Sequence, residues 1–126
     1  MVRTFRELVV WQKALDLVKE IYRVTQEFPK EEIFGLTSQL RRAAVSVPSN
    51  IAEGQGRLTE KEFRQFLGNA RGSLAEVETQ IIIANDLDFI NDQDFKNLSA
   101  MITEVGRVLN GLISSVISEK RSHKKS

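Results

Sequence analysis

The fold is set by the stretch that reads LVVWQKALDLVKEIYRVTQEF over residues 8–28. Its apolar residues recur at spacings of three and four, which is the period of an α-helix. On a helical wheel they form two adjacent seams, one with Leu8, Trp11, Leu15, Val18 and Tyr22, the other with Val10, Ala14, Leu17, Ile21, Val24 and Phe28. The seams together cover more than half of the circumference, whereas a surface helix of a monomer needs a stripe only somewhat wider than about 100°. This helix is expected either to lie deep in the core or to contact a second subunit.

Three further helical segments follow, and recognisable signals bound them. Pro29 ends the first helix, because proline restricts the residue before it and donates no backbone hydrogen bond. The second helix is expected over residues 36–54 and the fourth over residues 93–118. Between them, Thr59 has the pattern of an N-cap with acidic residues in the following turn, so the third helix is expected from there to Leu87.

Short connections between consecutive helices favour antiparallel neighbours, so the predicted fold is all-α, an antiparallel up-down-up-down four-helix bundle. One domain over residues 1–118 holds the bundle, and the apolar-free residues 119–126 are predicted to form a disordered basic tail. The third helix has a narrow apolar seam that leaves two isoleucines outside it. Exposed apolar patches often mark interfaces, so we expect a homo-oligomer with these candidate contacts: Val10, Leu17, Ile21, Ile82 and Ile83. Ordinary burial in the core is the alternative for each of them.

Composition excludes several classes of protein. The formal net charge is only +1, far from the basic excess of a dedicated nucleic-acid binder. The chain has no cysteine, so neither a disulfide framework nor a thiolate site is expected. No apolar run approaches the roughly 18 residues of a membrane span, and the first residues lack the pattern of a signal peptide. These features predict a cytoplasmic protein without membrane contact.

The second helix contains Pro48 where the periodicity predicts continuous helix. Proline removes one backbone donor and costs about 3 kcal/mol in an unadapted helix, so a kink with local compensation is expected. Polar side chains around the proline either bond to the freed carbonyls and to one another, or they line a pocket that offers cations to an anion. The candidate contacts for a nucleic acid or another partner in this segment are Arg41, Arg42, Asn50 and Glu53.

Few residues of the sequence support catalysis or metal binding. The only histidine, His123, lies in the polar tail, and no helix has the Glu-x-x-His motif of ferritin-like bundles. We therefore expect no enzymatic activity, no metal, no cofactor and no small-molecule substrate. The tail adds four candidate phosphate contacts, with solvated disorder as the alternative: Lys120, Arg121, Lys124 and Lys125.

In its second helix the sequence resembles a known bacterial family. The matching residues are Phe28-Pro29, Phe34-Gly35-Leu36, Gln39-Leu40-Arg41-Arg42-Ala43-Ala44, Ser46-Val47-Pro48-Ser49-Asn50-Ile51-Ala52-Glu53-Gly54, Glu62-Phe63, Phe66-Leu67 and Ala70-Arg71-Gly72-Ser73-Leu74-Ala75-Glu76. Similarity extends to Leu8-Val9-Val10-Trp11 and covers about residues 5–118. The family is the group of four-helix bundle proteins named after the 23S rRNA intervening sequence, often labelled ribosomal-protein-like.

The resemblance implies a four-helix bundle that assembles into a ring, typically a pentamer, with a mostly undefined biochemical role. A related branch is similar to accessory subunits of diversity-generating retroelements, which bind a reverse transcriptase and nucleic acid through a strongly basic surface. The near-neutral charge of this sequence departs from that branch. We expect a non-enzymatic oligomeric scaffold or accessory factor that binds RNA or an RNA-associated protein. A protein-interaction subunit without nucleic-acid contact is the alternative.

Overall fold

The structure is a computed structural model that describes the backbone of residues 4–125 and the side chains of residues 4–116. These residues form four α-helices and two short 3-10 helices, without a strand. In chain order the elements are η1 (Phe5–Glu7), α1 (Val9–Thr25), η2 (Lys30–Glu32), α2 (Leu36–Gln55), α3 (Glu60–Asp86) and α4 (Asp92–Lys125). The predicted all-α fold with four helices is confirmed.

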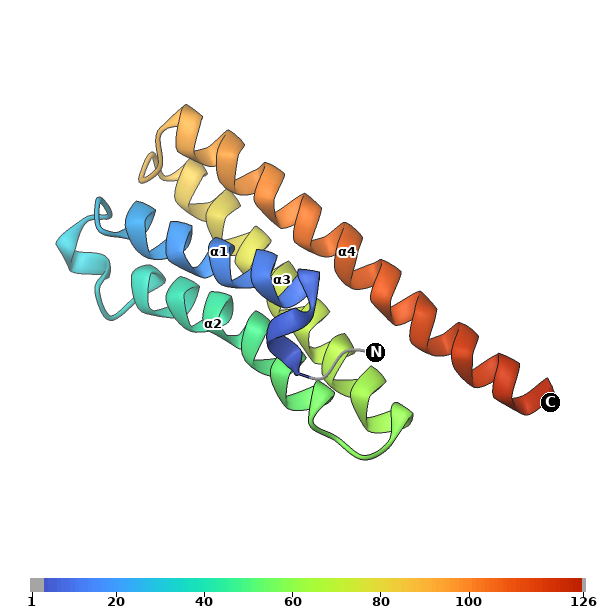
Figure 1. The fold of residues 1–126 in the computed structure, drawn as a ribbon. Helices are drawn as coiled ribbons and strands as arrows, with labels where there is room; N and C mark the ends of the chain where they lie inside the picture. Colours follow the sequence, from blue (N-terminus) through green and yellow to red (C-terminus); the bar gives the residue numbers. More distant parts are fainter. Residues whose placement is uncertain (1–3, 126) are drawn as a thin grey trace.

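The helices follow one another around a shared core. In Figure 1 the chain passes from α1 in blue to α4 in red, and successive helices run in opposite directions. Each helix packs against the next, and α4 returns to pack against α1. Every helix therefore turns one side toward the core and leaves another side at the surface.

Helix α4 is longer than the sequence predicts. Its backbone stays helical to Lys125, and its C-terminal part runs past the ends of the other helices (Figure 1). A disordered tail was expected from residue 119, but no glycine or proline follows Gly111 to end the helix. The side chains of the predicted tail contacts lie outside the described residues, so these contacts and the domain boundary at residue 118 stay predictions.

Side-chain caps account for the starts of α3 and α4. The hydroxyl oxygen of Thr59 accepts a hydrogen bond of 3.2 Å from the backbone N–H of Glu62, which confirms the predicted N-cap. At α4, the Oδ1 atom of Asn91 accepts a bond of 2.8 Å from the backbone N–H of Asp94. The connection between the two helices contains Asp88 with a φ of 62°, a left-handed conformation that aspartate adopts more readily than most residues.

The core takes only one of the two apolar seams of α1. Val10, Leu17 and Ile21 are at most 2% exposed within the single chain. This corrects the prediction that these three residues contact a second copy, because no surface of theirs remains free. Of the other seam, Leu8 is buried as well, whereas Trp11, Leu15 and Val18 are half-buried at the edge of the core and Tyr22 is exposed.

Helices α2 and α3 approach each other closely where α2 carries small residues. Gly54 is buried against α3, and a Cβ atom built there would lie 2.7 Å from the Cβ atom of Phe66. Nearer the middle of α2, the hydroxyls of Ser46 and Ser73 are 2.8 Å apart and share a hydrogen bond. The short side chains of α2 thus set the distance between these two helices.

Pro48 lies within α2, and the helix continues through it to Gln55. Two residues after it, the side-chain amide of Asn50 donates to the carbonyl oxygen of Ser46 at 2.8 Å and to its hydroxyl at 2.9 Å. Polar groups near the proline are thus bonded to one another, as the structural alternative predicts, whereas the predicted bond to the freed carbonyl, that of Ala44, stays a prediction. The predicted kink stays a prediction.

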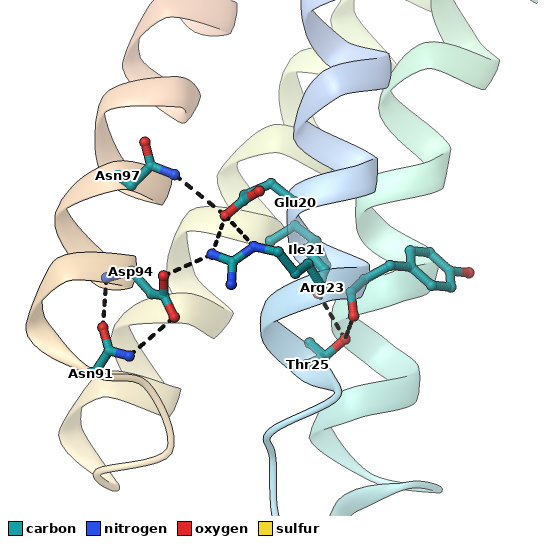
Figure 2. Close-up of polar contacts among 8 residues, drawn as sticks. Glu20, Ile21, Arg23, Thr25, Asn91, Asp94 and Asn97 are labelled. Atoms are coloured by element: carbon teal, nitrogen blue, oxygen red, sulfur yellow. Dashed lines mark hydrogen bonds and ion pairs between the residues drawn. The ribbon is translucent and has the colours of Figure 1, made fainter.

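A polar cluster joins the end of α1 to the start of α4 (Figure 2). Arg23 donates to Asp94 at 2.8 Å and also forms an ion pair with Glu20. Asn97 donates to the same Glu20 carboxylate at 3.4 Å, and Asn91 donates to Asp94 at 3.2 Å. These partly exposed contacts link the two helix ends. Each such ion pair usually adds only about 0–1 kcal/mol to the stability of the fold.

Gly54→Ala is expected to lower the free energy of unfolding by about 1–3 kcal/mol, the usual cost of overpacking a core. The added methyl group would meet Phe66 at 2.7 Å and the ring of Phe63 at 3.1 Å, so α3 would have to shift. The measurement is a urea unfolding curve at one fixed protein concentration.

Gly111→Ala is the matched control, because nothing lies within 4 Å of a Cβ atom built at Gly111. At this exposed helical position the change should raise the free energy of unfolding by about 0.5–1 kcal/mol through helix propensity alone. Equal gains in both variants would contradict a close contact at Gly54.

Candidate interaction surface

The apolar seam of α1 that the core leaves out forms one wall of a groove against α2. Trp11, Leu15 and Val18 line it from α1, and they are half-buried. From α2 the lining comprises Val45, Pro48, Ser49 and Ala52. The hollow holds about 310 Å³, and we call it the α1/α2 groove. Its shape follows from the sequence, since the short side chains of α2 cannot fill the space beside Trp11.

The groove continues into a second hollow that carries positive charge. This hollow of about 410 Å³ is lined by Tyr22, Ile33, Thr37, Ser38, Arg41, Arg42 and Val45. Val45 lines both hollows, so the two form one surface. The lining of the two hollows includes two arginines and no carboxylate. An apolar surface therefore ends in a cationic one.

Arg41 is held in place by neutral groups. Its Nε atom donates to the hydroxyl of Thr25 at 2.8 Å, and its guanidinium carbon lies 4.6 Å from the centroid of the Tyr22 ring. The buried Thr25 hydroxyl donates in turn to the carbonyl of Ile21 at 2.7 Å, as Figure 2 shows. Because the partners of this arginine are neutral, the contact fixes an unpaired cation beside the groove.

Arg42 follows on the exposed side of α2. In the described part of the chain, neither Arg41 nor Arg42 forms an ion pair. Other exposed arginines do form them: Arg23 with Glu20 and Asp94, and Arg107 with Glu104. Arg64 and Arg71 also lack an ion pair in the described part of the chain, but Arg41 and Arg42 are neighbours that line one hollow, where a carboxylate or a phosphate from outside can meet both charges.

The other predicted contacts of this segment lie elsewhere. Asn50 is occupied by Ser46, whose hydroxyl is shared with Ser73 of α3. Glu53 is exposed and pairs with Arg57 at 3.1 Å, four residues along the chain. The predicted set is therefore not one pocket: Arg41 and Arg42 line the hollow beside α1, Asn50 lies between α2 and α3, and Glu53 belongs to the end of α2.

A second apolar surface lies on the outer side of α3. Ile82 and Ile83 are 46% and 43% exposed, as their places outside the apolar seam predict. Thr79 and Asp86 are exposed as well, and their spacing of three and four residues places them on the same side of the helix. We call these four residues the α3 ridge. Residues 72–95 around it contain six acidic side chains and no lysine or arginine.

Nothing among the described side chains forms a metal or catalytic cluster. Within residues 4–116, no group of three histidine, cysteine, aspartate or glutamate residues is close enough to hold a metal ion. A hydrogen bond from Arg107 lowers the pKa of Glu104, and Glu20 and Asp94 raise the pKa of Arg23. Perturbed pKa values often mark active sites, but here they belong to exposed ion pairs. His123 and the tail cations Lys120, Arg121, Lys124 and Lys125 lie outside the described side chains.

Sequence reasoning missed Trp11, Leu15, Val18 and Val45 as surface residues. Both seams of α1 are apolar, so the wheel alone could not tell which one faces the core. One signal was present: the seam left outside contains Trp11 and Tyr22, whose polar atoms favour positions that reach water. The buried seam contains Ala14 and aliphatic residues only, up to the end of the helix.

None of the helices in the described part of the chain has the length and hydropathy of a membrane span.

Comparisons with known proteins place this fold in a family. A family model described as 23S rRNA-intervening sequence protein matches residues 6–111. A search of curated proteins finds no match. A crystal structure of a protein with unknown function from the S23 ribosomal protein family of Bacteroides thetaiotaomicron has the same fold, with a TM-score of 0.78 and 21% identity over 84% of this chain and 96% of that chain. Because the family model covers most of its residues, this chain belongs to the 23S rRNA-intervening sequence protein family.

Proposed function

We propose that the chain is a non-enzymatic scaffold that assembles from several copies and binds an RNA or an RNA-associated protein. The observation that supports this is the apolar surface that remains once the core is complete. Tyr22, Val45, Ile82 and Ile83 are between 39% and 46% exposed. Apolar patches of this kind on a small protein often mark interfaces. A homo-oligomer accounts for them, and the resemblance implies a ring of five.

The RNA part of the proposal is supported by charge and by the family description. Arg41 and Arg42 are cations without ion-pair partners in the described part of the chain, and the basic residues of 119–126 add to them. The family is named after an insert in 23S rRNA. Contacts from such cations to phosphates would give binding that falls with salt. With its cysteine-free composition, the protein suits the reducing cytoplasm, which is its proposed location.

A protein-interaction subunit without nucleic-acid contact is the second candidate. The net charge of +1 and the apolar lining of the α1/α2 groove favour it, because a phosphate-binding surface needs neither Trp11 nor Val18. In this case a polypeptide partner would still copurify with the chain after nuclease treatment. The two candidates share the assembly and differ only in the partner.

The first test concerns assembly. A single chain weighs 14.3 kDa, and sedimentation equilibrium of the wild-type protein is expected to give a mass several times larger. Dilution into the nanomolar range should shift the mass downward, because association follows mass action. A well-folded species of 14.3 kDa at micromolar concentration would contradict the scaffold proposal.

The second test concerns RNA, with a transcript of a bacterial 23S rRNA intervening-sequence hairpin as the probe. Wild-type affinity, measured by fluorescence anisotropy, should fall steeply between 50 and 200 mM salt, values at which phosphate contacts are strongly screened. Deletion of residues 119–126 removes four cations and should flatten the plot of log affinity against log salt, with a slope smaller by up to about 3–4 units. Arg41→Ala with Arg42→Ala should flatten it by up to about 2 units where the pair contacts RNA, and leave it unchanged where a neighbouring copy covers the pair.

The control for the RNA test is Arg107→Ala, which removes an exposed arginine that already pairs with Glu104. It should leave the slope nearly unchanged. Absence of binding at 50 mM salt would reject the RNA proposal and favour the protein-interaction subunit. The same conclusion follows if both cation-depleted variants keep the wild-type slope.

A further inference from the structure

We propose that the α1/α2 groove of one copy holds the α3 ridge of the next copy, so that copies join head to tail. This inference rests on the self-assembly in the proposed function and names the two surfaces that meet. One surface is concave and cationic at one end, and the other is convex and surrounded by acids. Both belong to the described residues of a single chain.

The apolar parts of the two surfaces fit in shape. The α3 ridge has two adjacent isoleucines, and the neighbouring residues on the same side of the helix, Ala75 and Thr79, are short and exposed. Ile82 and Ile83 therefore stand out from α3. The groove offers a space of about 310 Å³ between two helices, walled by Trp11 and Val18. Inserting a row of side chains into such a groove is the ordinary way in which helices pack.

Charge sets the direction of the contact. The cationic end of the groove carries Arg41 and Arg42, neither of which pairs with a carboxylate in the described part of the chain. The exposed carboxylates Glu78 and Asp86 lie one turn to either side of Ile82, and Asp86 is itself part of the ridge. No basic residue occurs between residues 72 and 95 along the chain, whereas in space Glu78 shares a hollow with Arg71 and Arg107, so Asp86 is the carboxylate with fewer cations nearby. Complementary potentials of this kind select one partner and one orientation.

The two surfaces lie on different helices, so the contact is heterologous. Each copy that binds a neighbour through its groove still has a free ridge, and the reverse holds for the neighbour. Repetition of one such contact closes into a ring when the rotation between copies permits it. A two-fold dimer would instead require the groove and the ridge of one copy to meet the ridge and the groove of the other at the same time.

The test uses two variants that each lose one surface. The groove variant is Arg42→Glu with Val45→Glu, and the ridge variant is Ile82→Glu with Ile83→Glu; all four positions are exposed, so the fold should persist. Analytical ultracentrifugation should show each variant alone at the monomer mass of 14.3 kDa. Mixed in equal amounts, the intact groove of one and the intact ridge of the other should form a 1:1 dimer and nothing larger.

The control variant is Leu58→Glu with Lys61→Glu, which changes the charge as much as the groove variant does. Both positions are exposed and lie outside the two surfaces, so the control should assemble like the wild type. Circular dichroism should show the same helix content in all variants.

Each outcome of this test supports or overturns either the pairing of the two surfaces or the proposed self-assembly. If the wild type assembles and either surface variant assembles as well, the inference is overturned while the proposed scaffold stands. Suppose that circular dichroism shows the groove variant and the ridge variant to be folded. If their mixture then stays monomeric, or forms particles larger than a dimer, the pairing of groove and ridge is overturned. A monomeric wild type would instead overturn the self-assembly in the proposed function.

Discussion

The close contact between α2 and α3 is the constraint on which the rest of the structure depends. Gly54 leaves no room for a side chain against Phe66, and the hydroxyls of Ser46 and Ser73 meet directly. With α2 drawn toward α3, the aliphatic seam of α1 closes the core, and Leu17 and Ile21 become fully buried. The aromatic seam of α1 then remains beside the short outer residues of α2. The groove is thus a consequence of how the core is packed.

The sequence predicted the helices well because their signals are local. The apolar period, Pro29 and the N-cap Thr59 each act within one or two turns, and the helix boundaries fall close to the expected places except at the end of α4, which has no such signal. The core side of α1 could not be predicted in the same way. Two apolar seams look alike on a wheel, and only the shapes of α2 and α4 decide between them. Val10, Leu17 and Ile21 were therefore placed on the wrong side.

The structure separates the contacts predicted on α2, and the separation has one cause. Arg41 and Arg42 do lie beside an open hollow, whereas Asn50 and Glu53 do not. Those two were grouped with the arginines by their places on one helix. In the structure their neighbours come from elsewhere: Asn50 belongs to a network that reaches Ser73 of α3, and Glu53 pairs with Arg57 beyond the end of its own helix. A single helical wheel contains no information about such partners.

A net charge near zero conceals how the charges are arranged. The acids of residues 72–95 and the unpaired Arg41 and Arg42 are separated on the surface, which favours contact between copies more than contact with a polyanion. If the two arginines are covered at each junction, the cations left for phosphates are those of residues 119–126. Helix α4 carries the backbone of residues 119–125 past the end of the bundle (Figure 1). Self-assembly and RNA contact would then use different parts of the chain, and a ring would gather several weakly binding tails into one multivalent surface.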